Sequence, residues 1–223
     1  MHRQALDHLR RVDPTMALVI NRVGPCRFRA RSEGTHFDAV VRSIVYQQLS
    51  GSAAFTIHSR LLALFGGDSV EPRRLLDTPD ETLRGVGLSR QKILYLKDLA
   101  ARVGAGALPI HALHELDDDA VVDALTSVKG VGRWTAQMFL MFRLGRPDVL
   151  PELDLGIRKA IQRAYRTRGL PSTARVLRIG AAWAPHRTIA SWYLWRSLEV
   201  DGATATPAAK RQGGGTRGRR AKR

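Results

Sequence analysis

With 223 residues, 44% of them hydrophobic, and a net charge of +16, the chain is long enough for one or two packed units and basic enough to predict a polyanionic partner, usually nucleic acid. Its single cysteine, Cys26, excludes a disulfide framework, a Cys-x-x-Cys zinc site and a four-cysteine iron–sulfur cluster. No apolar run approaches the roughly 20 residues of a membrane span, and the N-terminus is too charged for a secretory signal, so a cytoplasmic protein without membrane contact is expected.

Helix signals follow one another along the chain, and alternating strand patterns are absent over any useful length, so the fold is predicted to be all-α, with short helices and tight turns. Thr35 and Asp38 resemble a capping box ahead of apolar residues at helical spacing. Further helix starts are predicted at Thr78-Pro79-Asp80-Glu81, at Ser89 and at Asp117 or Asp118, and further helices at 133–144, 154–167, 174–183 and 187–199.

Two glycine turns share one design, "LRGVGLSRQKILYL" at 83–96 and "VKGVGRWTAQMFL" at 128–140. They indicate either close approach of the backbone to a ligand or two glycine-containing helix ends. The second turn predicts a hairpin at 125–137, whose second helix would present unpaired N–H groups to a DNA phosphate. The expected DNA backbone contacts are Lys129, Gly130, Val131, Gly132, Arg133, Thr135, Arg158 and Arg187, although the last two arginines could instead anchor nearby acids.

The end of the chain differs in composition from the rest. From Asp201 onward almost no large apolar residue occurs, and residues 210–223 carry seven positive charges and no negative one, which leaves +9 on residues 1–209. Residues 201–223 are therefore predicted to be a disordered basic tail, either a nonspecific DNA tether or a solvated end. For the whole chain, a merely solubilising basic surface is the alternative to a polyanion partner.

Four segments resemble one enzyme family. "LTSVKGVGRWTA" resembles the helix-hairpin-helix motif of the DNA glycosylase superfamily, and "DVLPELDLGIRKA" looks like the following segment with its essential aspartate, here Asp154. "SIVYQQLSGSAA" and "WAPHRTIASWYLWR" are similar to segments of the alkylation-repair branch. Together they span about residues 35–200, and the family that they resemble is 3-methyladenine DNA glycosylase II.

This resemblance implies a two-lobed helix-hairpin-helix glycosylase fold with an active-site cleft between the lobes. One lobe would combine residues 1–34 with 146–200, and the other would hold residues 35–145. The larger bacterial members have an additional N-terminal β-rich domain, which is not expected here because so few residues precede Thr35.

The resemblance also implies roles for individual residues. Asp154 would be catalytic, and Trp134 stands where glycosylases that also cut the strand have a Schiff-base lysine, so no lyase activity is expected. The implied base pocket contains Trp134, Trp195, Tyr46 and Met138, the last in place of a tyrosine. The implied wedge region is Gln47, Gln48, Leu49 and Ser50, with Gln48 as the wedge candidate and Leu49 as its competitor. Main-chain carbonyls of Thr126, Val128 and Val131 would hold a monovalent cation; no side-chain metal site and no organic cofactor are implied.

Plainer interpretations apply to several of these residues. Asp154 precedes a helix and could be an ordinary N-cap. The nearby acids Asp148 and Glu152 lie off the family match and are predicted to be solvated, and Trp183 and Trp192 are assigned to the core. His111 and His114 have helical spacing for a metal, but no third ligand accompanies them.

The function predicted from these residues is hydrolytic removal of alkylated purines from duplex DNA: 3-methyladenine, 7-methylguanine and possible further substrates hypoxanthine and ethenoadenine. The expected protein is a monomer, acts on damaged double-stranded DNA and is associated with the nucleoid. Two alternatives stay open, a helix-hairpin-helix protein that grips DNA without chemistry and a glycosylase for another lesion. Asp154 discriminates against the first, because an acid near phosphates is unfavourable for backbone gripping alone.

Overall fold

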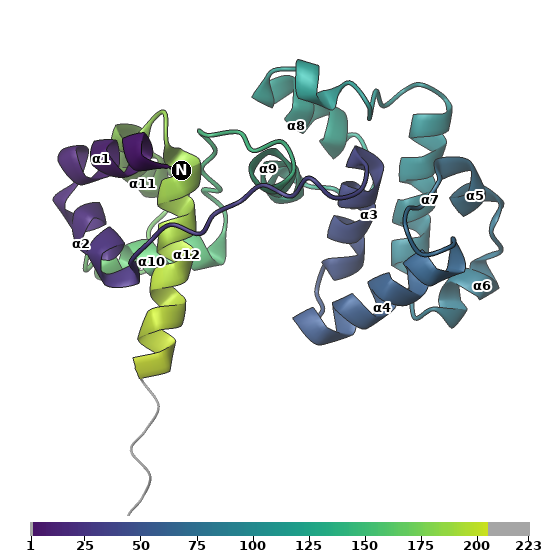
Figure 1. The fold of residues 1–223 in the computed structure, drawn as a ribbon, viewed down its shortest axis with the longest axis horizontal. Coiled ribbons are helices and arrows are strands. Elements are labelled where there is room, and N and C mark those ends of the chain that lie inside the picture. Colours follow the sequence, from purple (N-terminus) through teal and green to yellow (C-terminus); the bar gives the residue numbers. More distant parts are fainter. Residues whose placement is uncertain (1, 205–223) are drawn as a thin grey trace, which may run out of the picture.

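A computed structural model describes residues 2–204, which form α-helices and short 3-10 helices (η), with no strand in that range (Figure 1). In chain order these are α1 (Arg3–Val12), α2 (Pro14–Val23), α3 (His36–Tyr46), α4 (Gly51–Leu64), α5 (Pro72–Asp77), α6 (Asp80–Gly85), α7 (Arg90–Gly104), η1 (Leu113–Glu115), α8 (Asp118–Thr126), α9 (Arg133–Phe142), α10 (Leu155–Ala164), α11 (Thr173–Gly180), η2 (Ala181–Trp183) and α12 (Arg187–Thr204). The all-α prediction is confirmed. No helix in the described range is long and apolar enough to cross a membrane.

Three of the predicted helix starts are confirmed by their caps. Thr35 and Asp38 form a reciprocal capping box at α3, Ser89 accepts the amide of Lys92 at α7, and Asp117 accepts the amide of Ala120 at α8. These signals are local, because each cap bonds within three residues of itself.

The helix start predicted at Thr78-Pro79-Asp80-Glu81 is confirmed, because α6 begins at Asp80, but Thr78 is not its cap. Helix α5, for which the sequence pattern provides no clear signal, ends directly before Thr78, and the Thr78 hydroxyl turns back to donate to the Arg74 carbonyl at 2.7 Å. Helix α6 then begins after Pro79 without a side-chain cap. Thr78 therefore closes the first of two helices instead of starting the second.

The helices enclose two hydrophobic cores. The central core draws its buried residues from Phe37 to Val149, and the second combines residues 5–28 with residues 150–194. Figure 1 shows the two corresponding groups of helices, with α9 between them and the helix-free segment 24–35 crossing from α2 to α3. The predicted lobe boundaries at 34/35 and 145/146 stay a prediction. The predicted disordered tail starts inside α12, which continues to Thr204, and its remaining residues lie outside the described part.

In the second core, a buried acid joins residues that lie far apart in the sequence. Asp13 caps α2, and its Oδ2 accepts hydrogen bonds from the Trp183 indole at 2.8 Å and the Tyr165 hydroxyl at 2.5 Å. Trp183 is fully buried and Trp192 is 8% exposed, so the assignment of both to the core is confirmed.

Asp38 of the α3 capping box is expected to make the free energy of unfolding depend on pH. Burial alone would raise the pKa of Asp38, but hydrogen bonds from the amides of Val70 and Thr35 and from two hydroxyls lower this pKa below its ordinary value. A carboxylate with a lowered folded-state pKa stabilises the fold above its unfolded pKa of about 3.9 and loses this contribution as the pH falls through the folded value. We expect Asp38→Asn to lower the free energy of unfolding by about 1–3 kcal/mol at pH 7 and by less at pH 3, measured by urea denaturation.

Asp77→Asn is the control for that measurement, because the Asp77 carboxylate is exposed and only 3.9 Å from Arg73 within one helix turn. Its effect should be small at both pH values. An Asp38→Asn effect that is the same at pH 7 and pH 3 would show that the charge of Asp38 does not stabilise the fold.

Candidate active site

Asp154 lies at the N-terminus of α10, between two tryptophans from other helices. Its Oδ1 accepts the amide of Ile157 at 2.8 Å, which is an N-cap bond, and the Trp195 indole N–H at 2.9 Å. Its Oδ2 accepts the Trp134 indole N–H at 2.8 Å. Asp154 is therefore the ordinary helix cap that its sequence position allows, and it is also the point where α9, α10 and α12 are joined.

Gly156 makes room for this arrangement. A Cβ at Gly156 would lie 2.9 Å from the Asp154 Oδ1 and 2.9 Å from the Trp195 Cδ1, closer than side-chain atoms approach one another. Any larger residue would push Trp195 away from the carboxylate. Trp195 packs against both hydrophobic cores, so the site lies where the two lobes meet.

The two predicted aromatic walls differ in accessibility. Trp134 is 44% exposed, whereas Trp195 is partly buried and has one face stacked on Phe142, with ring centroids 6.0 Å apart. Sequence reasoning missed the two leucines that flank Asp154, Leu153 and Leu155, which are 53% and 51% exposed. The available signal in the sequence was a large apolar side chain on each side of the candidate catalytic carboxylate.

The structure does not place Tyr46 and Met138 in contact with Asp154. Both are partly buried against the central core. The Arg42 guanidinium lies 4.3 Å from the centre of the Tyr46 ring, and the His58 ring packs edge-on with its centroid 6.0 Å from that of Tyr46. Because a cation already covers one face of Tyr46, this ring is a poorer platform for a cationic base than Trp134. Their pocket roles stay predictions.

The turn between α3 and α4 contains the predicted wedge residues. Gln47 donates from Nε2 to the Gly130 carbonyl at 2.9 Å, and Ser50 caps α4 through the amide of Ala53. Gln48 has a left-handed backbone with φ 56°, and Leu49 is 39% exposed. Gln47 thus ties the turn to the hairpin, while the choice between Gln48 and Leu49 as the wedge remains open.

Lys92 of α7 holds the carbonyl groups of this turn. No sequence pattern predicts this role for Lys92. Its Nζ donates to the carbonyls of Val45 at 2.6 Å and Gln47 at 2.9 Å. Burial lowers the pKa of Lys92 below its ordinary value. Gln47 and Lys92 therefore fix the wedge turn from two sides.

The hairpin between α8 and α9 is built around a glycine. Gly130 has φ 76°, and a Cβ there would lie 2.2 Å from the ring of Tyr95, a residue of the other glycine-turn segment. Gly132 precedes α9 in an extended conformation with open space around it, and no side chain caps this helix. The first amides of α9 consequently have no intrahelical acceptor and are available to an anion.

Two residues of the hairpin that were predicted to contact DNA use their backbone N–H groups in hydrogen bonds within the protein. The Lys129 amide donates to Asp98 Oδ2 at 2.9 Å, and the Val131 amide donates to the Val128 carbonyl at 3.1 Å, so neither N–H is free for phosphate. Thr135 is 6% exposed, which leaves only its amide for such a contact. Internal hydrogen bonds therefore hold the hairpin at Lys129 and Val131, and the glycine pattern did not predict them.

The two arginines predicted to contact the DNA backbone, Arg158 and Arg187, both form hydrogen bonds within the protein. Arg187 forms a bidentate pair with Asp148 at 2.7 and 2.8 Å, so it anchors an acid, as the alternative interpretation allowed. This pairing outweighs the effect of burial and lowers the pKa of Asp148. Arg158 donates from Nε to the Pro171 carbonyl at 2.9 Å. The acids Asp148 and Glu152 are not solvated as predicted, because an arginine pairs with each: Arg187 with Asp148 and Arg133 with Glu152.

The predicted main-chain cation site involves the same hairpin. The Val128 carbonyl accepts the Val131 amide and keeps a second lone pair; a monovalent cation on the carbonyls of Thr126, Val128 and Val131 stays a prediction. No group of three His, Cys, Asp or Glu side chains suitable for a metal occurs within residues 2–204. The His114 ring lies against His36, with ring centroids 5.8 Å apart.

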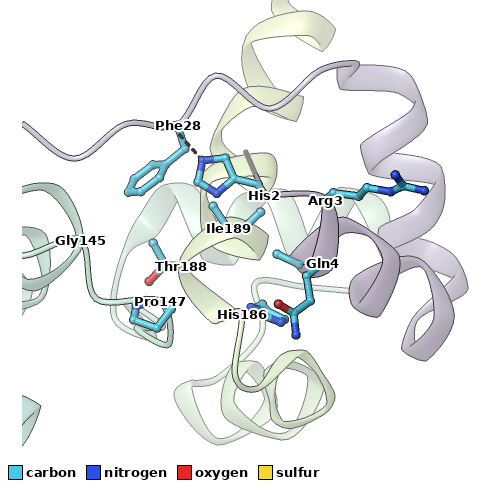
Figure 2. Close-up of a pocket in the computed structure, with 10 residues that line it drawn as sticks. His2, Arg3, Gln4, Phe28, Gly145, Pro147, His186, Thr188 and Ile189 are labelled. Atoms are coloured by element: carbon cyan, nitrogen blue, oxygen red, sulfur yellow. Dashed lines mark hydrogen bonds between the residues drawn. The ribbon is translucent and has the colours of Figure 1, made fainter.

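A cavity of about 400 Å³ lies apart from these residues, where the starts of α1 and α12 meet (Figure 2). Its lining includes Arg3, Gln4, His186 and Ile189, and the His2 ring donates to the Phe28 carbonyl at 3.0 Å beside it. Asp154 and the predicted pocket tryptophans are not among its lining residues, so this cavity is not the candidate base pocket.

Comparisons with known proteins show which family the chain resembles. The profile of the HhH-GPD superfamily of base excision DNA repair proteins matches residues 41–186. DNA-3-methyladenine glycosylase 1 of Schizosaccharomyces pombe is 33% identical over 196 residues, which is 86% of each chain. A structure of a 3-methyladenine DNA glycosylase from the same organism with abasic DNA has a TM-score of 0.80 and 32% identity, covering 88% of this chain and 97% of that one.

A second solved structure gives the same result. A DNA-3-methyladenine glycosidase from Bacillus halodurans superimposes with a TM-score of 0.79 and 34% identity, covering 89% of this chain and 91% of that one. The profile match extends over more than half of the chain and includes the hairpin and Asp154, and it ends directly before α12. The chain therefore belongs to the HhH-GPD superfamily of base excision DNA repair proteins.

Proposed function

We propose that the protein is a monofunctional DNA glycosylase that hydrolyses the N-glycosidic bond of alkylated purines in duplex DNA and so initiates base excision repair. The observation that carries this proposal is the Asp154 carboxylate, held by two indole N–H groups beside the exposed face of Trp134. The substrates are 3-methyladenine and 7-methylguanine, with hypoxanthine and ethenoadenine as further candidates. The similarity to 3-methyladenine glycosylases supports this choice.

The chemistry needs little from the protein at the base itself. A purine methylated at N3 or N7 carries positive charge, so when the C1′–N bond breaks it leaves as a neutral base with the bonding electron pair. The sugar becomes cationic at C1′, and a carboxylate next to it stabilises that charge. A water oxygen then bonds to C1′ and gives up a proton, which Asp154 can accept.

The hydrogen bonds of Asp154 suit this role. Within residues 2–204, Oδ1 accepts two N–H groups, from Ile157 and Trp195, whereas Oδ2 accepts only one, from Trp134. A carboxylate oxygen has room for about two acceptor bonds, so Oδ2 keeps one direction for a water or the sugar. The orientation of the carboxylate is thus fixed while its reactive oxygen stays available.

Trp134 contributes in two ways. It has no amine, so it cannot form a Schiff base with the sugar, and the product is an intact strand with an abasic site. Its exposed ring offers a stacking surface to a cationic base, worth about 1–2 kcal/mol for a good contact. Undamaged purines lack this charge and gain less from the same ring.

The partner is double-stranded DNA with damaged bases, bound by a monomer in the cytoplasm at the nucleoid. The net charge of +16 and the uncapped start of α9 support a backbone grip without sequence reading. Flipping the damaged base costs a few kcal/mol, and Gln48 or Leu49 would fill the space that it leaves.

We expect the purified protein to release free 3-methyladenine and 7-methylguanine from methylated duplex DNA, and the strands to break only after alkali treatment. Chromatography of the released bases and gels with and without alkali measure these two results. Strand breakage without alkali would contradict the monofunctional assignment. Salt-dependent duplex binding without release of any methylated purine would favour a DNA-gripping protein or a glycosylase for another lesion.

A further inference from the structure

The loop that carries Asp154 is fastened to α9 by a buried acid. Glu152 is 8% exposed, its Oε1 accepts from Arg133 Nε at 3.2 Å, and its Oε2 accepts from Gln137 Nε2 at 2.8 Å. Gln137, which is 4% exposed, also donates to the Leu150 carbonyl at 3.2 Å. Two α9 side chains thus hold the loop at two positions before it reaches Asp154.

The same helix holds Asp154 itself. Arg133 and Gln137 are four residues apart and therefore project from one face of α9, and Trp134 follows Arg133 directly. The Trp134 indole bonds Asp154, two residues after Glu152 in the loop. The loop and α9 are therefore joined at two neighbouring points. Glu152 bonds Arg133 and Gln137, and Asp154 bonds Trp134.

We propose that Glu152 is a positioning residue for catalysis, which fixes the Asp154 loop to α9 so that the carboxylate stays on the Trp134 indole. This rests on the proposed glycosylase function. A carboxylate buried beside a DNA-binding hairpin has a desolvation cost and would repel phosphate, so a role in DNA affinity does not explain it. Its two charge-assisted hydrogen bonds to one helix explain it as a fixed spacer.

Arg133 gives the arrangement a second property. It is about half exposed, and Glu152 engages its Nε at 3.2 Å, so the far side of the guanidinium still faces solvent near the start of α9. A phosphate bound there would contact the same arginine that holds Glu152.

The four tryptophan indoles provide a direct readout. In two-dimensional ¹H–¹⁵N NMR, Glu152→Ala is expected to move the Trp134 indole resonance toward its position in Asp154→Ala, because the hydrogen bond to Asp154 weakens. The Trp183 indole, bonded to Asp13 in the second core, should not move and serves as an internal control. Glu115→Ala, an exposed acid of η1, is the matched control variant.

The second readout is excision of 3-methyladenine under single turnover. For Glu152→Ala we expect a loss of about 10–100-fold, as misplacing a catalytic group by about 1 Å produces, with the Kd for an abasic-analogue duplex changed less than about threefold. Glu152→Gln keeps one carbonyl oxygen and should fall between wild type and Glu152→Ala. If Glu152→Ala does not fold, the excision rate and the Trp134 resonance of Glu152→Gln test the proposal.

Three results would overturn the proposal: an unmoved Trp134 resonance in both Glu152 variants, excision rates within threefold of wild type, or losses of excision and DNA affinity in parallel. If the wild type releases no methylated purine, the proposed function fails. The indole resonances then decide by themselves whether Glu152 holds Asp154 on Trp134.

Discussion

Asp154→Asn is expected to reduce single-turnover excision of 3-methyladenine by at least about 10³-fold while leaving the affinity for undamaged duplex nearly unchanged. The amide has almost the shape of the carboxylate but no charge to stabilise the cationic sugar. It also has one oxygen where the structure shows indole donors at both Oδ1 and Oδ2, so an NH₂ group would face one of the indole N–H groups.

The matched control is Asp117→Asn, because Asp117 also caps a helix, through the Ala120 amide at 2.8 Å, and lies outside the site. Asn is also a good N-cap, so this variant removes only the charge beside the helix N-terminus; it should cost less than about 1 kcal/mol of stability and leave excision unchanged. If Asp154→Asn excised 3-methyladenine at the wild-type rate, Asp154 would be only a helix cap and the catalytic assignment would be wrong.

Gly130→Ala is expected to lower the free energy of unfolding by about 2–4 kcal/mol and to weaken duplex binding. Its backbone has φ 76°, which strains any residue with a Cβ, and that Cβ would lie 2.2 Å from the Tyr95 ring. The ring or the hairpin must move, and a shifted hairpin also loses the Gln47 bond to the Gly130 carbonyl. Urea denaturation and a duplex-binding titration measure the two effects.

Gly132→Ala is the control, since this glycine of the same hairpin has an extended backbone, and a Cβ added to it would meet no atom within 4 Å. Its effect on stability should stay below about 1 kcal/mol. Adding Tyr95→Ala to Gly130→Ala should recover the part of the loss that comes from overlap with the ring, though not the backbone strain. Equal destabilisation by Gly130→Ala and Gly132→Ala would contradict this account.

The parts of the fold that can be predicted from the sequence are those set by neighbours in the chain. Thr35, Ser89 and Asp117 cap helices through residues three positions later, so their patterns suffice. The assignment of Asp154 has the same local basis, as a cap inside a family motif. Its two indole partners agree with the tryptophans that the resemblance singles out.

The polar contacts that sequence reasoning misses join residues far apart in the chain. Asp148 meets Arg187 across 39 positions, and the Lys129 amide meets Asp98 across 31. A charged side chain with no local partner looks solvated, because only the packing of helices shows which arginine or amide reaches it. The solvated state predicted for Glu152 is wrong for this reason.

The interleaved second core sets an order of assembly during synthesis. Residues 37–149 leave the ribosome as one stretch that contains the whole central core, whereas Leu9, Met16 and Ile20 must wait for α10 and α12. Apolar side chains of α1 and α2 therefore stay uncovered until α10 and α12 have been translated, and chaperones bind such surfaces during that interval. A chain terminated before α12 would still contain the buried residues of the central core, but the apolar side chains of α2 that pack on α12 would be exposed and prone to aggregation.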